Sequence, residues 1–220
     1  MRLPPWRRPL LLAAALSLGT TSASSQTAVA RPAAFETGLL PAPRAPRSVA
    51  WVETLPAVDL VGANGARERV RLYGPDGEVD PEARARFEHV VAGDAPPHAL
   101  APRLEQLVVK AAYHFGGARV VVVSGFREHA GRHGTGEAID FKLEGVRAAT
   151  LAAWLRHLPR VGVGIYTHPR TQYVHLDVRD TSYHWIDASP PGVRWRERPL
   201  RDPGQVKRDA GWRPEDDLPG

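Results

Sequence analysis

Ser124-Gly-Phe-Arg-Glu-His-Ala-Gly-Arg-His-Gly-Thr-Gly-Glu-Ala-Ile-Asp140 is the stretch that organises this chain, and Tyr173-Val-His-Leu-Asp177 complements it. Zinc favours nitrogen and oxygen ligands, and a hydrolytic zinc site uses three protein ligands and leaves a fourth position for water. Bound zinc lowers the pKa of that water to about 7, which makes hydroxide available at neutral pH. The two stretches therefore predict a zinc site made of His133, Asp140 and His175.

The spacing of His175 and Asp177 predicts that both side chains face this site. Positions i and i+2 of a strand point the same way, so the residues between and beside them would face the core. By the same alternation, Glu137 should face away from the side that carries Asp140. Two roles are open for Asp177: a general base that takes a proton from water, or a carboxylate that orients a histidine ligand.

The patterns around these stretches indicate an α+β fold, with an antiparallel sheet and helices packed on one side of it. Helices begin at Pro81, with Asp80 as N-cap, and near Pro102, where an apolar stripe runs to a stop at Gly116-Gly117. The predicted strands cover residues 51–60, 67–73, 119–123, 137–143, 161–167 and 172–179, and a short helix covers 146–157.

The two ends of the chain differ from the middle in composition. Residues 1–30 resemble a secretory signal peptide, with early arginines, a short apolar run at Leu10–Leu18 and small residues after it. That run is too short to span a membrane, although an uncleaved signal anchor stays an alternative. Residues 31–48 are predicted to be a linker, 49–189 the folded domain, and 190–220 an extended Pro/Arg-rich tail. We therefore expect an exported protein, periplasmic or extracellular, with no stable membrane insertion after signal removal.

Four motifs in order carry a family resemblance: Ser124-Gly-Phe-Arg127, His133 to Asp140, Gly162-Val-Gly-Ile-Tyr166 and Val174-His-Leu-Asp177. They resemble the zinc murein peptidases of the D-Ala-D-Ala carboxypeptidase and MepK-like endopeptidase type, which share their fold with the hedgehog signalling domain. The resemblance covers about residues 68 to 188. It implies a zinc-dependent endopeptidase or carboxypeptidase that hydrolyses an amide bond in peptidoglycan stem peptides or cross-links.

The resemblance also implies roles for single residues. Asp177 would be the catalytic base, and Arg127 would contact the scissile carbonyl or a substrate carboxylate, for which a fixed guanidinium is suited. A structural ion pair is the alternative for Arg127. Further substrate-binding residues are predicted by position: Ser124, which could instead order the loop, Tyr166, His184 and Trp185, the last two as part of one wall of the cleft.

Composition limits the partners. The 220 residues contain no cysteine, so histidine and carboxylate must carry any metal. The net charge of +5 comes mainly from scattered arginines rather than a dense basic run, so we expect no nucleic-acid binding. A mildly basic surface suits an anionic cell-wall polymer, and we expect a monomer that binds peptidoglycan or its peptides.

One departure from the family keeps other functions open. Only residues 128–132 separate Arg127 from His133, whereas many relatives have a longer segment there. The shortened segment changes the substrate wall on that side. The alternatives are therefore a non-catalytic, zinc-containing cell-wall-binding module and a zinc carboxypeptidase that acts on soluble peptides.

Overall fold

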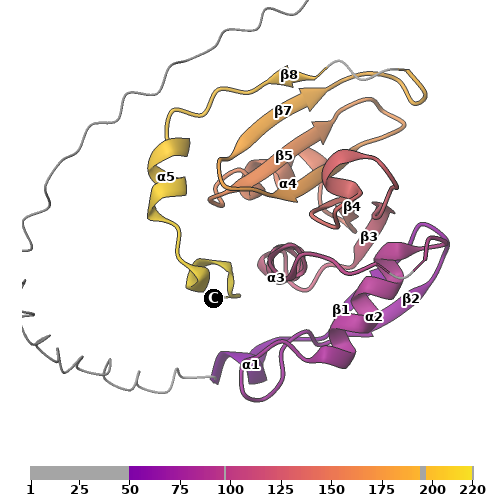
Figure 1. Cartoon of the computed structure of the whole chain (residues 1–220), viewed down its shortest axis with the longest axis vertical. Helices are drawn as coiled ribbons and strands as arrows, with labels where there is room; N and C mark the ends of the chain where they lie inside the picture. The colour runs from indigo at the N-terminus through magenta and orange to yellow at the C-terminus, as the bar shows by residue number, and fades with distance from the viewer. Residues whose placement is uncertain (1–49, 97, 194–196, 220) are drawn as a thin grey trace, which may run out of the picture. The chain divides into compact units, whose positions relative to one another are not determined.

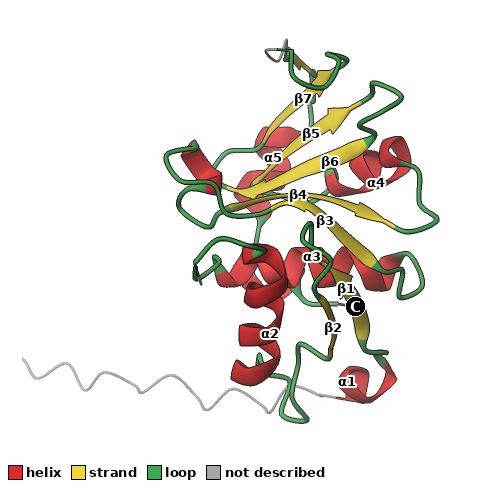
Figure 2. Cartoon of the chain, turned by 90° about the vertical axis from the view of Figure 1, so that its right-hand side faces the viewer, coloured by secondary structure: helices red, strands yellow, loops and turns green. Residues whose placement is uncertain are grey.

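The structure, a computed structural model, describes residues 50–96, 98–193 and 197–219. The predicted signal peptide (1–30) and linker (31–48) lie outside the described residues. Within the described part, helices are interspersed among the strands of a sheet, as Figures 1 and 2 show. None of its helices has the length and apolarity that crossing a membrane requires.

The described strands form one sheet in the order β2-β1-β3-β4-β6-β5-β7-β8 (Figure 2). Their bounds are β1 Val58–Val61, β2 Arg67–Val70, β3 Val120–Ser124, β4 Ala138–Leu143, β5 Val161–Tyr166, β6 Tyr173–Val178, β7 Tyr183–Asp187 and β8 Arg198–Pro199. β1 pairs with β3 in parallel, as does β5 with β7, whereas the other neighbouring pairs are antiparallel.

The prediction of a purely antiparallel sheet is therefore wrong, because the sheet is mixed. The chain leaves β1, pairs back as β2 and then passes through two helices before β3, which lets β3 run in the same direction as β1. β6 returns antiparallel to β5, and the next reversal places β7 on the free edge of β5. Such crossovers are invisible to a strand-by-strand pattern.

The helices predicted to begin at Pro81 and near Pro102 are present as α2 and α3, and the short helix predicted over residues 146–157 is present as α4. The bounds of the helices are α1 Ala50–Thr54, α2 Pro81–Ala92, α3 Pro102–His114, α4 Ala148–Leu155 and α5 Gln205–Gly211, with 3-10 helices η1 Gly131–His133 and η2 Pro214–Asp217. Asp80 caps α2 by accepting a hydrogen bond from the Ala83 backbone at 2.7 Å, as predicted. The stretch predicted as one strand over 51–60 instead forms α1 followed by β1.

A single apolar core holds the sheet and helices together. Phe141 of β4 and Leu176 of β6 contribute to it, and Leu107 of α3 and Leu155 of α4 pack in the same cluster. All four side chains are fully buried. Because β4 and β6 alternate, the residues next to Phe141 and Leu176 in sequence point to the opposite face, where the polar site lies.

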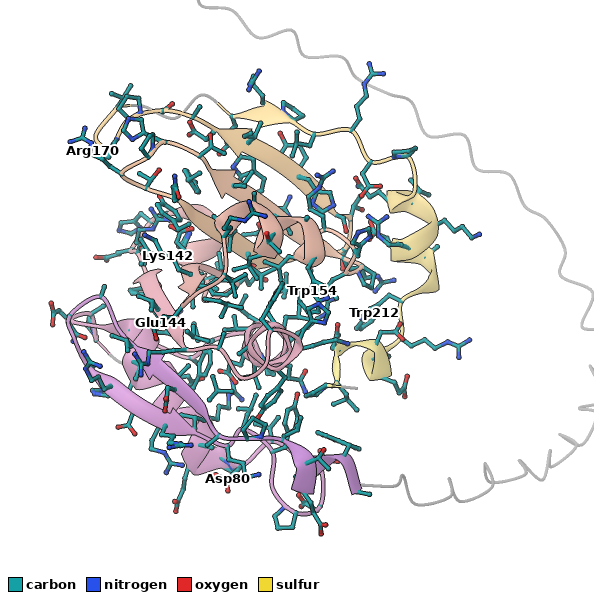
Figure 3. All side chains as sticks on the ribbon, turned by 180° about the vertical axis from the view of Figure 1, so that it is seen from behind. Asp80, Lys142, Glu144, Trp154, Arg170 and Trp212 are labelled. Carbon is teal, nitrogen blue, oxygen red and sulfur yellow. The ribbon has the colours of Figure 1, made fainter. Side chains whose placement is uncertain are left out.

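Residues 198–219 fold against the domain, so the prediction of an extended tail is wrong for them. Asp217 of η2 accepts hydrogen bonds from Arg103 of α3 at 2.7 and 3.1 Å and from Trp212 Nε1 at 3.0 Å. Trp212, labelled in Figure 3, lies between α5 and η2. The charges that suggested a solvated segment are partners for basic residues of the domain, which pattern analysis of the tail alone does not reveal.

Candidate metal centre

Three side chains from separate elements meet on the polar face of the sheet. His133 ends η1, Asp140 lies on β4 and His175 on β6, where Asp140 and His175 are direct neighbours in the register. His175 Nδ1 lies 2.8 Å from Asp140 Oδ1 and 3.2 Å from His133 Nε2, and His133 Nε2 lies 3.5 Å from Asp140 Oδ1. All three residues are buried. The structure thus brings together the three residues that the sequence predicts as ligands.

The loop before β4 places His133 through backbone constraints. His133 donates its backbone N–H to Ala130 at 3.1 Å, and Ala130 donates to Arg127 at 3.1 Å, so the loop turns tightly. Gly136 has a φ of +73°, and a Cβ there would collide with the carbonyl oxygen of Ala99. This position requires glycine, because other residues rarely adopt such a φ and the space is filled.

Each histidine makes a second hydrogen bond that fixes its ring. His133 Nδ1 lies 2.7 Å from the Gly125 carbonyl oxygen, so it carries a proton and leaves Nε2 with a free lone pair. His175 Nε2 lies 3.1 Å from Asp177 Oδ2, which leaves Nδ1 directed at Asp140 and His133. Metal-binding histidines almost always have such an outer partner, because it sets the tautomer and orientation of the ring.

The electrostatics of the group favour a charged carboxylate. Burial alone would raise the pKa of Asp140, but its electrostatic interactions with the His133 and His175 imidazoles outweigh burial and hold that pKa below its usual range. Burial likewise opposes the charged form of His175, yet hydrogen bonds to Asp140 and Asp177 raise the pKa of its imidazole. The site therefore stabilises positive charge beside the Asp140 carboxylate, as a cation site must.

Asp177 lies across the His175 ring from the other two candidate ligands. Its carboxylate is 1% exposed, and Arg179 binds both of its oxygens, Nε to Oδ1 at 2.6 Å and Nη2 to Oδ2. Arg132 Nε lies 3.6 Å from Oδ1. Of the two roles open from sequence, this geometry favours the orientation of His175 over direct proton transfer, because both oxygens are already engaged away from the three donor atoms.

Arg127 contacts the candidate metal centre and also reaches solvent. Its Nη2 donates to Asp140 Oδ2 at 3.1 Å, while Asp140 Oδ1 faces the histidines. Its side chain is 48% exposed. The ion pair that the sequence left as an alternative is therefore present, and the exposed part of the guanidinium can still contact a substrate.

Trp185 and Tyr166 lie on the same face as His175. The Trp185 ring centroid is 5.0 Å from that of His175, and Tyr166 stacks on Tyr173 at 4.3 Å. The position of Trp185 agrees with a wall of the site. Ser124 is the register partner of Asp140 after an irregularity in β3, and its hydroxyl has no hydrogen-bond partner among the described residues.

His184 does not face the site, contrary to the prediction that it binds substrate. It is 1% exposed, and its Nε2 lies 3.4 Å from Asp202 Oδ2, in the segment before α5. Burial and the nearby Arg156 lower the pKa of its imidazole to about 4, so the ring is neutral at pH 7. The physical reason is strand alternation in β7: since Trp185 points toward His175, its neighbour points to the opposite face.

Arg132 and Arg179, which bind Asp177, were missed in the sequence. The i, i+2 rule that paired His175 with Asp177 also places Arg179 on that face, so the signal was available. Glu197 was missed as well, because it lies in the supposed tail. Burial raises the pKa of its carboxyl, and His175 and Arg179 are close enough to oppose that shift electrostatically.

Gly164 of β5 makes room for the Trp185 indole. A Cβ at this position would lie 2.7 Å from Trp185 Nε1 and closer still to two ring carbons. We expect Gly164→Ala to displace the ring from His175 and to lower the free energy of unfolding by about 1–3 kcal/mol, the usual range for overpacking. Thermal unfolding monitored by circular dichroism measures this. Gly211→Ala, where nothing lies within 4 Å of the added Cβ, is the matched control and should be neutral; equal effects would contradict the account.

Two imidazoles and a carboxylate with outer hydrogen bonds define a protein with a candidate mononuclear metal centre. Residues 88–177 match the family model described as Peptidase M15, so this part of the chain is similar to that family of peptidases. The match confirms the resemblance to zinc murein peptidases at family level and spans Arg127, the three candidate ligands and Asp177. Neither a search of curated proteins nor a search of solved structures returned a match.

Proposed function

We propose that the protein is an exported zinc metallopeptidase that hydrolyses an amide bond in peptidoglycan stem peptides or cross-links. The observation that carries the proposal is the buried cluster of His133, Asp140 and His175 inside the region matched by the peptidase family. Export is supported by the composition of residues 1–30, which provides a positive start, an apolar run and small residues after it. Peptidoglycan lies outside the cytoplasm, which agrees with that route.

The donor atoms fit zinc. Four tetrahedral ligands at roughly 2.0–2.1 Å from the ion are about 3.3 Å apart. The three distances between His175 Nδ1, Asp140 Oδ1 and His133 Nε2 are 2.8, 3.2 and 3.5 Å, so one ion could bind all three atoms with little movement. Nitrogen and carboxylate ligands without sulfur are also the set used by hydrolytic zinc sites. When bound, zinc would supply a Lewis acid and an activated water.

The chain's own residues divide the remaining tasks. Asp177 holds His175 in the ring orientation that directs Nδ1 toward the cluster. Arg127 keeps Asp140 in place and offers a permanently charged guanidinium to the scissile carbonyl or a substrate carboxylate. Trp185 closes the site beside His175 and excludes water from that side. Substrate contacts by Tyr166 and Ser124 are part of the proposal.

The decisive experiment is mass spectrometry of muropeptides digested by the purified, zinc-loaded protein. We expect products that gain one water per bond broken, and the masses identify the bond. His133→Ala should slow cleavage by about 10³-fold or more, because a catalytic metal is worth several kcal/mol. His168→Ala, in the exposed turn between β5 and β6, is the matched control. Intact muropeptides, or equal activity of His133→Ala and wild type, would end the proposal.

A zinc-containing cell-wall-binding module without turnover is the second candidate. It is favoured by one observation: both oxygens of Asp177 are bound to Arg179, so the residue predicted as base is not free to take a proton. This candidate predicts that the protein sediments with purified peptidoglycan and leaves its muropeptide masses unchanged, with zinc still bound at one ion per chain.

A further inference from the structure

An arginine-rich cavity of about 400 Å³ lies next to the contacts of Asp177. Its lining includes Arg103, Arg132, Arg160, Arg179, Glu137 and Trp212. Arg132 and Arg179 both contact Asp177, which binds His175. The cavity is therefore separated from the candidate metal centre by one layer of side chains, and nothing in the proposed mechanism uses it.

Arg160 is held so that one end of its guanidinium stays free. Its backbone N–H donates to Asp209 Oδ1 at 2.6 Å, and its Nε donates to the Asp209 carbonyl at 3.2 Å. The guanidinium carbon lies 4.6 Å from the centre of the Trp212 ring, which fixes the plane of the group. The two terminal nitrogens have no hydrogen-bond partner within the described part of the chain. They are donors placed in advance, at little entropic cost for a ligand.

Two neighbouring guanidinium groups are likewise fixed by some of their nitrogens and leave another nitrogen unbonded. Arg132 uses Nη1 for Glu137 at 2.8 Å and for the Val178 carbonyl at 2.7 Å, and its Nη2 has no partner among the residues described. Arg179 uses Nε and Nη2 for Asp177, and its Nη1 is likewise without a partner there. Arg103 is different: its three nitrogens bind Asp217 and two backbone carbonyls, so it supports the wall.

The free N–H groups, rather than the net charge, select the ligand. The lining contains four arginines and two acidic residues, Glu137 and the exposed Asp180, so its formal charge is +2. The buried carboxylates of Asp177 and Asp217 cancel this charge. Planar guanidiniums with paired donors match carboxylates geometrically. We propose that this cavity is a subsite for a carboxylate of the peptide substrate, beyond the Asp177 side of the candidate metal centre. The inference rests on the proposed function for the identity of the peptide.

The test compares stem peptides that differ in one group. Each carboxylate of a muropeptide is amidated in turn, and KM and kcat are measured for wild type, Arg160→Gln and Arg69→Gln. For one carboxylate, amidation should raise the wild-type KM about 10-fold with kcat little changed, the size of one charge-assisted hydrogen bond. For Arg160→Gln, the KM values of the peptide with that carboxylate free and with it amidated should differ by less than about twofold. Arg69 lies on β2, far along the sheet order from this cavity, and Arg69→Gln should keep the wild-type preference.

The outcomes separate this proposal from the proposed function. Cleavage with no preference at any carboxylate, or a preference that Arg160→Gln leaves unchanged, would overturn the subsite while the peptidase stands. If no peptide is cleaved, the same pairs are titrated calorimetrically, and the expected preference then appears in Kd. A lower melting temperature of Arg160→Gln with unchanged selectivity would show that the arginines only stabilise the fold, and would also overturn the subsite.

Discussion

Asp140→Ala is expected to lower zinc affinity by at least about 10²-fold and to abolish peptidase activity. A zinc site with four ligands contributes roughly 10–16 kcal/mol, so one ligand accounts for about 3 kcal/mol or more. Asp140 is also the acidic member of the cluster. Without it, His133 Nε2 and His175 Nδ1 lie 3.2 Å apart, and no carboxylate remains to balance the charge of a bound cation. Arg127 loses its partner as well, which adds uncompensated positive charge beside the site.

Metal content by mass spectrometry and competition with a chelator of known affinity measure this loss. Asp59→Ala is the matched control, because Asp59 lies on β1 of the same sheet, and its ion-pair partners among the described residues are Arg69 and Arg119, at 3.8 and 3.9 Å. It should bind one zinc with wild-type affinity. If Asp140→Ala keeps one tightly bound zinc per chain, the cluster of three is not the metal site.

Asp209→Ala is expected to lower the free energy of unfolding by about 3 kcal/mol or more. Asp209 of α5 is 7% exposed and accepts hydrogen bonds from the Arg160 backbone at 2.6 Å, from the Ser182 backbone at 2.8 Å and from the Ser182 hydroxyl at 2.6 Å. Alanine would leave these donors unpaired, and each unsatisfied buried group costs about 1–3 kcal/mol. Urea unfolding measures the loss. Asp94→Ala, at an exposed hydrogen bond, is the control and should change little.

The pH dependence of stability tests the same anchor. Burial would raise the pKa of Asp209, but hydrogen bonds from Ser182 and Arg160 outweigh it and lower the pKa. A lowered pKa in the folded state stabilises the fold above the unfolded value near 4, and this contribution is lost as the pH falls further. Wild type should therefore lose more stability than Asp209→Ala below about pH 4. Parallel pH profiles of the two proteins would contradict this role.

Local alternation predicts which neighbouring side chains share one face of a strand. The i, i+2 spacing of His175 and Asp177 places both on one face of β6, and the register then aligns His175 with Asp140 of β4. The same rule separates His184 from Trp185: Trp185 lies beside His175, whereas His184 is buried on the other face of β7 and does not line the cleft with it. Two residues adjacent in a strand therefore cannot both line one wall of the cleft.

The sheet order and the C-terminal segment could not be read from local patterns. The parallel pairing of β5 with β7 depends on where the chain returns after β6, which no residue of β7 encodes by itself. Asp217 suggested a solvated end until its partner was known, and that partner, Arg103, is 114 positions earlier. A charged side chain without a known partner is predicted to be exposed, because burying an unpaired charge costs free energy. A partner of opposite charge from a distant part of the chain lowers that cost and allows burial.

The link between Arg103 and Asp217 also bears on how the chain reaches its native state. During synthesis, α3 emerges long before its acidic partner, and Lys110 cannot bind the Leu218 carbonyl until a residue 108 positions later has been made. Contacts of such sequence separation slow folding, because the ends of a long loop must meet before they stabilise it. We therefore expect synthesis from the N-terminus to give a partly folded intermediate that reaches the native state only after residues 214–218 have emerged.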